Sequence, residues 1–333
     1  MATPRRRRFL LRLALAAFSG FLALIGGLAA RSVLALSGFG AGHRDRFTDP
    51  ADRFDPELGW APIPNYQALI ESDRVTTNRL GFRSPELDDD RDKIVILGDS
   101  VAWGNGVGDE QTVSSRLQRR LSGMPLQVVN MAVSGYGPDQ EYVWLRRNIS
   151  SLNRRRKTKL IVLVLCAYND LDDLANPFAE GRIKPHYRMR DGRLNAPSPV
   201  SKYGLTNLIC AMGLPGAWKR KLLLALNDPA SYDESELLMR EFYHRIQRLA
   251  EDSGARFAVV VSPWEDNLRG RELGQYERFG RILAGQGYAV IDFKPVLGRQ
   301  GDPAPFLFDG VHYSAAGNDL LAETIYRRLI PRR

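Results

Sequence analysis

Residue types suited to acyl transfer occur in short motifs that lie far apart in the sequence. Ser100 follows Gly98 and Asp99, and His312 lies three residues after Asp309. A serine hydroxyl is a weak nucleophile that needs a base, and the base needs a carboxylate to orient it. The three-residue spacing allows one turn of chain to bring both side chains to one face. Ser100, Asp309 and His312 are therefore the candidate catalytic residues.

Acyl transfer also requires N–H donors for the oxyanion of the tetrahedral intermediate. Ser100 is expected at a helix N-terminus, where its backbone N–H lacks an intrahelical partner. Gly135, in the run 133–135, allows the backbone to approach a ligand closely, and Gly137 is an alternative. Asn169 adds a side-chain amide donor. Ser100, Gly135 and Asn169 are the candidate oxyanion hole.

Composition and charge exclude several other functions. The chain has 333 residues, of which 44% are hydrophobic and 26% charged, as in ordinary globular proteins. Its two cysteines, Cys166 and Cys210, are too few for a disulfide framework or a zinc-finger ligand set. No cluster has metal-ligand spacing and the glycine-rich run 104–108 lacks the Lys-Ser/Thr of a phosphate loop, so neither metal nor cofactor is expected. The net charge of +9 forms no basic stripe with interleaved aromatics, which argues against a nucleic-acid partner.

Strands and helices are expected to alternate along most of the chain. Apolar runs predict strands at 93–97, 126–130, 160–166, 257–261 and 288–291. Amphipathic patterns predict helices at 113–121, 139–152, 238–249, 268–284 and 321–329. This alternation favours an α/β fold with a parallel sheet covered on both sides. The serine, glycine and asparagine motifs each follow a strand, so they are expected at the carboxyl edge, where such sheets bind ligands.

The N-terminal 36 residues are typical of export or membrane anchoring. Five arginines precede residue 13, and the uncharged segment 13–30 would span roughly 27 Å as a helix. The arginines should stay cytoplasmic, which places the rest of the chain in the periplasm of a bacterial cell. An uncleaved anchor in the inner membrane and a cleaved signal peptide both remain open, and residues 6–10 resemble a twin-arginine signal.

Three further segments complete the predicted organisation. Residues 37–92 are expected to form a linker and an irregular extension that packs on the domain edge. The main domain is expected to cover 93–333, with an insertion at 171–232 after the third strand. Within the insertion, residues 187–194 predict a hairpin with an Asp-Gly turn.

The four motifs together resemble the SGNH hydrolases, also called the GDSL esterase/lipase superfamily. The nucleophile block matches Gly-Asp-Ser at 98–100, the backbone glycine matches Gly135, the asparagine matches Asn169, and the Asp-x-x-His block matches 309–312. The resemblance covers roughly 93–330. The extension, with its runs 58–60 and 78–83, is similar to that of membrane-anchored bacterial members.

The resemblance implies a three-layer α/β/α sandwich of the flavodoxin-like SGNH type, with a five-stranded parallel sheet. It also implies a serine-dependent ester hydrolase acting on a small ester, a lipid or a cell-envelope glycan. Two alternatives are an O-acyltransferase that uses the same triad on an envelope polysaccharide, and a catalytically silent glycan-binding module. Trp103, Tyr136 and Tyr168 are candidates for lining the substrate pocket, with aromatic core packing as the alternative.

Overall fold

The computed structural model describes most of the chain after residue 50. The described residues are 26–27, 51–70, 73–179, 182–195, 197, 200, 209, 216–226 and 229–331. None of the helices in these ranges is long and apolar enough to cross a membrane. The segment 13–30 lies outside the described residues except for Gly26 and Gly27, so the membrane span stays a prediction.

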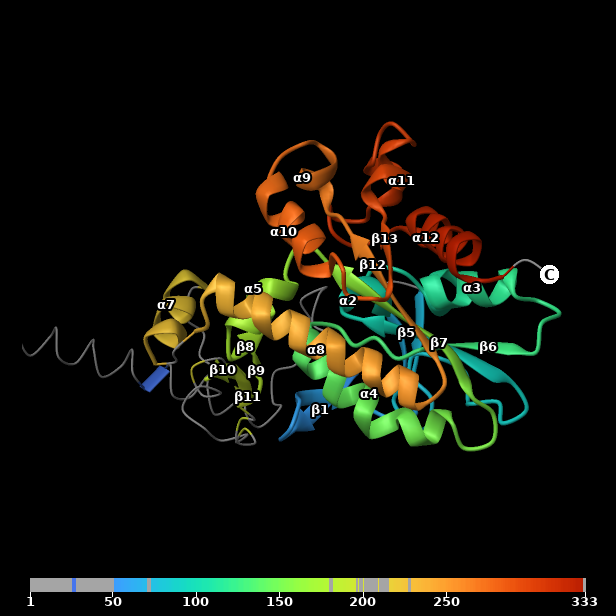
Figure 1. The fold of residues 1–333 in the computed structure, drawn as a ribbon, viewed down its shortest axis with the longest axis horizontal. Coiled ribbons are helices and arrows are strands. Elements are labelled where there is room, and N and C mark those ends of the chain that lie inside the picture. The colour runs from blue at the N-terminus through green and yellow to red at the C-terminus, as the bar shows by residue number, and fades with distance from the viewer. Residues whose placement is uncertain are drawn as a thin grey trace, which may run out of the picture. The chain divides into compact units, whose positions relative to one another are not determined.

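Five parallel strands form the central sheet and confirm the predicted α/β architecture (Figure 1). They are β5 (Asp92–Gly98), β6 (Leu126–Asn130), β7 (Thr158–Cys166), β12 (Arg256–Ser262) and β13 (Ala289–Asp292). Their order across the sheet is β13-β12-β7-β5-β6, and every neighbouring pair is parallel. The serine motif follows β5 and the asparagine motif follows β7, which are neighbours in the sheet.

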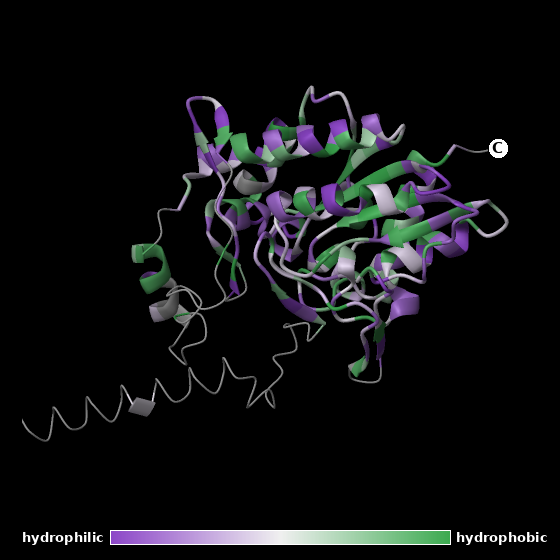
Figure 2. Cartoon of the chain, turned by 90° about the horizontal axis from the view of Figure 1, so that it is seen from below, coloured by the Kyte–Doolittle hydropathy of each residue, from purple (hydrophilic) through white to green (hydrophobic). Residues whose placement is uncertain are grey.

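Successive side chains of the strands enter two hydrophobic cores on opposite faces of the sheet. In β5, Ile94 and Ile96 belong to one core, whereas Val95 and Leu97 belong to the other. This alternation follows from the two-residue repeat of a strand. Because both faces are covered, the middle parts of the central strands are apolar, and Figure 2 shows the strands as largely hydrophobic.

Helices cover both faces of the sheet (Figure 1). Residues of α4, α8 and α10 line the core that contains Val95, and residues of α3, α11 and α12 line the core that contains Ile94. The helices around the sheet are α2 (Ser100–Trp103), α3 (Val113–Arg120), α4 (Pro138–Leu152), α5 (Asp170–Ala175), α8 (Tyr232–Asp252), α9 (Glu265–Leu268), α10 (Leu273–Leu283), α11 (Lys294–Gly298) and α12 (Ala315–Leu329), with 3₁₀ turns η1 (Asp109–Gln111) and η2 (Ala304–Phe306).

Local sequence signals set several helix boundaries. The hydroxyls of Thr112, Ser231 and Ser314 accept backbone N–H bonds at the starts of α3, α8 and α12. The helix predicted at 268–284 is present as α10, but it begins at Leu273, because a turn follows the short helix α9. That turn contains Gly270 and Glu272 at φ 74° and 49°, a left-handed conformation that ends a helix.

The extension contains two antiparallel hairpins where the sequence predicts irregular structure. β1 (Asp52–Asp55) pairs with β2 (Gly59–Pro62), and β3 (Gln67–Ile70) pairs with β4 (Asp73–Thr76). Strands of four residues are too short for an apolar alternation to stand out. Leu58, Trp60 and Phe82 are buried in the core that α4 and α8 cover. The extension therefore packs on the domain, as its motifs suggested.

The chain divides into two compact units. One comprises Asp49–Glu180, Lys184–Val200 and Pro229–Arg333, and it contains the sheet together with β8 (Phe178–Ala179). The other comprises Met1–Thr48, Gly181–Ile183 and Ser201–Asp228, and its described elements are β9 (Arg182–Ile183) and α7 (Gly216–Leu226).

The hairpin predicted at 187–194 is present in the first unit. β10 (Arg188–Arg190) pairs with β11 (Arg193–Asn195) in an antiparallel arrangement. Asp191 and Gly192 form the turn with φ values of 51° and 70°. Two positive φ values are what a two-residue type I′ turn requires, which explains the Asp-Gly pair.

Candidate active site

The end of β5 turns sharply so that α2 begins at Ser100. Gly98 has a φ of 147°, and a Cβ there would lie 2.8 Å from the carbonyl oxygen of Val164, so no larger residue fits. Asp99 caps the helix, since its Oδ1 accepts a hydrogen bond from the Val101 N–H at 2.9 Å. As the first helical residue, Ser100 has a backbone N–H without an intrahelical acceptor. The turn thus presents a hydroxyl and an N–H together at the sheet edge.

Ser100, His312 and Asp309 form a continuous hydrogen-bonded chain. The distance from His312 Nε2 to Ser100 Oγ is 2.8 Å, and the distance from His312 Nδ1 to Asp309 Oδ2 is also 2.8 Å. Asp309 Oδ1 accepts the backbone N–H groups of Val311 at 3.1 Å and His312 at 2.9 Å. The structure therefore brings Ser100 into hydrogen-bonding contact with a histidine that lies 212 positions later in the sequence.

The state of Asp309 suits a carboxylate that orients an imidazole. Its partial burial raises the pKa of the carboxyl, but the hydrogen bonds from the ring and backbone of His312 outweigh this and lower the pKa to about 2. Asp309 is thus ionised throughout the neutral range. An ionised carboxylate at Nδ1 holds the proton on that nitrogen and leaves Nε2 to accept the proton of Ser100.

The loop that carries His312 is anchored to the end of β12. A bridge between Leu307 and Tyr313 closes the loop, and the Tyr313 hydroxyl lies 2.7 Å from Ser262 Oγ, at the last residue of β12. The Glu265 N–H donates to the Gly310 carbonyl at 2.7 Å. These contacts hold the histidine loop against the loop that follows β12.

The predicted oxyanion donors occupy distinct environments. Gly135 is buried with a φ of 75°, and its N–H makes no hydrogen bond with the described residues. The N–H of the alternative, Gly137, already donates to Gln140 Oε1 at 3.2 Å. Ser100 presents its N–H at the start of α2, as described above. The geometry therefore favours Gly135 over Gly137 as the available backbone donor.

The Asn169 amide is held by a residue that the sequence analysis missed. Asn169 Nδ2 donates to Asp173 Oδ2 at 2.7 Å, and the Asn169 side chain also hydrogen-bonds the buried carboxyl of Asp99. Asp173 lies four residues later, one helical turn along α5. The run of aspartates in α5 was the available signal, because an i,i+4 carboxylate is within reach of an asparagine amide.

Two of the three residues predicted to bind substrate lie in the protein core. Trp103 is 2% exposed and Tyr136 is 1% exposed, so neither side chain can line an open pocket, and the prediction is corrected for both. The Tyr136 hydroxyl instead donates to the Trp60 carbonyl at 2.7 Å. Tyr168 is 49% exposed, and its ring packs edge-on against Trp264 with 5.0 Å between centroids.

Trp264 was not selected from the sequence. It follows β12 at the same sheet edge as the other motifs, and this position after a strand was the available signal.

Three buried carboxyl groups lie close enough together for their charges to interact. Burial is the main cause that raises the pKa of Asp99, Glu141 and Asp170, and each also feels the charge of neighbouring acids or His312. Both carboxyl oxygens of Glu141 are buried and have no hydrogen-bond partner among the described residues. Burial and mutual repulsion thus favour the neutral form of Glu141.

A buried ion pair involves Asp139, which lies four residues after Gly135. Lys184 Nζ donates to both oxygens of Asp139 at 2.6 and 2.7 Å, and both side chains are almost completely buried. We expect Lys184→Met to lower the free energy of unfolding by about 3–5 kcal/mol, because it leaves the Asp139 charge buried and unpaired. Urea denaturation of the variant measures this loss. The double variant Lys184→Met/Asp139→Leu should recover much of the loss, whereas equal destabilisation of both variants would contradict the explanation.

Among the described residues, the site contains neither a metal-binding cluster nor a reactive thiol. No three His, Cys, Asp or Glu side chains in them are placed to hold a metal ion. Cys166 is a buried free cysteine, and burial raises the pKa of its thiol well above the usual value. A protonated, inaccessible thiol does not compete with Ser100 as a nucleophile.

Comparisons with known proteins give one family match and several similar solved structures. Residues 96–320 match the GDSL-like lipase/acylhydrolase family. No curated protein matches the chain. Among solved structures, TesA is 18% identical, with a TM-score of 0.43, over 72% of this chain and 98% of its own.

Two further solved structures are similar at the level of fold. A lipase/acylhydrolase from Enterococcus faecalis is 15% identical, with a TM-score of 0.40, over 73% of this chain and 99% of its own. The esterase EstA from Pseudoalteromonas sp. is 12% identical, with a TM-score of 0.41, over 71% of this chain and 95% of its own. Because the family match spans more than half of the sequence, from β5 into α12, the chain belongs to the GDSL-like lipase/acylhydrolase family.

Proposed function

We propose that the protein hydrolyses O-acyl esters through a covalent acyl-enzyme formed on Ser100. The hydrogen-bonded chain from Ser100 through His312 to Asp309 carries this proposal. His312 Nε2 takes the hydroxyl proton as Ser100 Oγ attacks the ester carbonyl, and the alcohol leaves with that proton. A water then attacks the acyl carbonyl, His312 accepts its proton, and Ser100 is regenerated as the acid departs.

Three N–H donors are available for the oxyanion that forms in both steps. They are the backbone N–H of Ser100, the backbone N–H of Gly135 and the side-chain amide of Asn169, whose hydrogen bond to the Asp99 carboxyl the oxyanion would replace. Donors fixed before the reaction stabilise the developing charge without reorganisation, which is the main reason such sites accelerate acyl transfer. Asp99 and Asp173 hold the elements that carry two of these donors and do not contact the ester.

The direct test combines labelling with turnover. A fluorophosphonate probe should modify the protein once, at Ser100, as read by mass spectrometry of tryptic peptides. A series of p-nitrophenyl esters from acetate to decanoate should then show hydrolysis and reveal the preferred acyl length. A protein that is neither labelled nor active on any ester of the series would contradict the proposal.

Two aromatic side chains, the exposed Tyr168 and the partly buried Trp264, indicate where the substrate binds. Tyr168 directly precedes Asn169, and Trp264 lies beside Glu265, whose N–H bonds to Gly310 in the histidine loop. The Tyr168–Trp264 pair therefore links the oxyanion side of the site to the base. Aromatic faces bind acyl chains and the apolar faces of sugars. We infer that the Tyr168–Trp264 pair lines the binding site for the acyl chain or for a sugar part of the ester.

We expect Trp264→Ala to raise KM for the preferred ester about tenfold while kcat changes less, because the variant removes binding area and leaves the triad intact. Steady-state kinetics on the p-nitrophenyl series measures this effect. Phe54→Ala, which removes an aromatic that is 37% exposed on β1, is the matched control and should leave KM unchanged. A fall in kcat at constant KM would instead assign Trp264 to holding the histidine loop.

We further propose that the N-terminal segment anchors the chain in the inner membrane of a bacterium, with the catalytic unit in the periplasm. The arginines before residue 13 and the uncharged segment 13–30 support this orientation. Alkaline carbonate extraction should leave the full-length protein in the membrane fraction. Protease added to spheroplasts should digest the catalytic unit, and protection of that unit would contradict the orientation.

A further inference from the structure

Two motifs of the extension contact the backbone elements that carry the oxyanion donors. Trp60 belongs to the run 58–60, and Arg83 belongs to the run 78–83. The proposed reaction assigns no role to either run. We propose that Trp60 and Arg83 are positioning residues of the oxyanion hole, so that the extension is part of the catalytic framework. This inference rests on the proposed serine-hydrolase function.

Trp60 contacts the peptide group whose N–H belongs to Gly135. The Trp60 indole N–H donates to the Ser134 carbonyl oxygen at 3.1 Å, and both residues are buried. That carbonyl and the Gly135 N–H belong to the same planar trans peptide, so they point in opposite directions. A hydrogen bond that fixes the direction of the carbonyl therefore also fixes the direction of the N–H.

Gly135 needs such an external constraint. A glycine at φ 75° has no side chain to pack, and rotation of the peptide before it costs less than at other residues. The loop is held on its other side as well, because the Tyr136 hydroxyl donates to the Trp60 carbonyl at 2.7 Å and the two rings pack with centroids 5.6 Å apart. Trp60 thus contacts the residues on both sides of Gly135.

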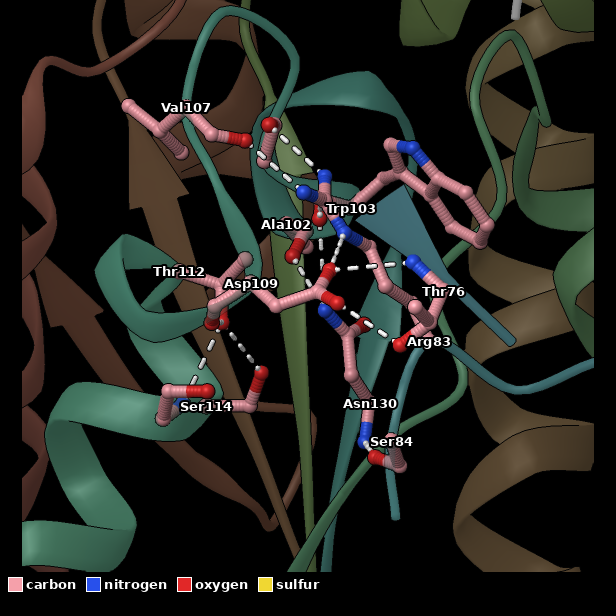
Figure 3. A network of polar contacts seen from close by, with 12 residues as sticks. Thr76, Arg83, Ser84, Ala102, Trp103, Val107, Asp109, Thr112, Ser114 and Asn130 are labelled. Atoms are coloured by element: carbon pink, nitrogen blue, oxygen red, sulfur yellow. Dashed lines mark hydrogen bonds and ion pairs between the residues drawn. The ribbon is translucent and has the colours of Figure 1, made fainter. Parts of the chain in front are cut away.

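Arg83 contacts the other end of the helix that begins with Ser100. Its guanidinium is 2% exposed and donates to the carbonyls of Trp103 at 3.2 Å, Gly104 at 2.9 Å and Val107 at 2.7 Å (Figure 3). Its Nε pairs with Asp109 Oδ1 at 2.9 Å. The carbonyls at a helix C-terminus carry partial negative charge, so a buried cation is stabilised there.

Because α2 is short, the contacts of Arg83 at its C-terminal end also affect the position of Ser100. The helix has four residues, and the N–H groups of Gly104 and Asn105 in the following turn both donate to the Ser100 carbonyl. The Ala102 and Trp103 carbonyls accept from side chains instead. Asn130 Nδ2 donates to the Ala102 and Trp103 carbonyls at 3.1 and 3.3 Å, and Arg83 supplies the remaining donors (Figure 3). Movement of this end would displace the Ser100 N–H and hydroxyl together, three residues away.

The test compares two conservative variants with matched controls. Trp60→Phe removes the indole N–H and keeps an aromatic ring, and Arg83→Lys keeps the charge but loses the forked geometry. Trp144→Phe is the control for Trp60, because Trp144 is also buried but its indole N–H has no hydrogen-bond partner in the part of the chain that the structure describes. Arg79→Lys is the control for Arg83, because Arg79 lies in the same run in an exposed ion pair with Glu86.

Three measurements separate positioning from general destabilisation. For Trp60→Phe and Arg83→Lys we expect kcat on p-nitrophenyl acetate to fall on the order of tenfold, below the 10²–10³-fold loss of a whole oxyanion donor, with KM nearly unchanged. The Kd of a boronic acid, which forms a tetrahedral adduct with Ser100, should rise by the same factor. Thermal unfolding should show that each variant and its control are folded at the assay temperature.

Each outcome distinguishes the positioning role from the hydrolase function. A control that matches its variant in kcat and boronic acid affinity would overturn the positioning role and leave the hydrolase function standing. A wild-type protein that is unlabelled by fluorophosphonate and inactive would overturn both. Losses in kcat and boronic acid affinity that occur in Trp60→Phe and Arg83→Lys alone would support the proposal.

Discussion

Replacing Ser100 with alanine is expected to lower kcat by about four to six orders of magnitude, because the variant retains the oxyanion donors and the base but has no nucleophile. Ser100 Oγ is the atom that His312 Nε2 contacts at 2.8 Å, and this contact identifies it as the hydroxyl placed for attack. Initial rates on the preferred p-nitrophenyl ester at high enzyme concentration measure this loss. Fluorophosphonate labelling of the variant should also disappear.

A matched serine variant shows whether the loss is specific to the site. Ser122→Ala removes an exposed hydroxyl in the turn after α3 and should retain full activity. Circular dichroism and thermal unfolding should be similar for both variants, since Ser100→Ala removes only a hydroxyl, whose hydrogen bonds are with the side chains of Asp99 and His312. Turnover of Ser100→Ala within tenfold of the wild type would show that another group attacks the ester.

The sheet could be predicted from the sequence because burial on both faces produces a distinctive pattern. β5 and β7 are flanked by helices on each side, so their residues form unbroken apolar runs. The order of motifs then places Ser100 and Asn169 at one edge, since parallel strands share a carboxyl end. The short polar strands β1 to β4 lack any such pattern, and their pairing depends on contacts with the rest of the domain.

The supporting residues of the site could not be predicted, because their partners are distant in sequence or are backbone atoms. The Trp60 indole N–H bonds to a carbonyl 74 positions away, and the Arg83 guanidinium bonds to carbonyls 20 to 24 positions away. Backbone acceptors leave no signature in residue type. Trp103 and Tyr136 show the converse limit, since an aromatic beside a catalytic motif has the same sequence appearance whether it lines a pocket or fills the core.

The carboxylate of the triad leads to the second large effect. We expect Asp309→Asn to lower kcat by about 10⁴-fold, because an amide at this position cannot both accept from Nδ1 and stabilise the imidazolium, and it favours the wrong tautomer. Asp309 Oδ2 lies 2.8 Å from Nδ1, while Oδ1 accepts two backbone N–H groups that an amide oxygen can still accept. The loop geometry should therefore survive, and steady-state kinetics should show the loss in kcat with KM little changed.

The pH dependence of stability provides an independent check on the same residue. Because the folded-state pKa of Asp309 is lowered from 3.8 to about 2, its ionised form stabilises the fold above pH 3.8, and this contribution is lost as the pH falls towards 2. The stability difference between the wild type and Asp309→Asn should therefore shrink over that interval, as measured by urea denaturation at a series of pH values. A difference that is independent of pH would show that the carboxylate is not held by His312 in the folded protein. A wild-type rate retained in Asp309→Asn would show that the imidazole needs no carboxylate to act as the base.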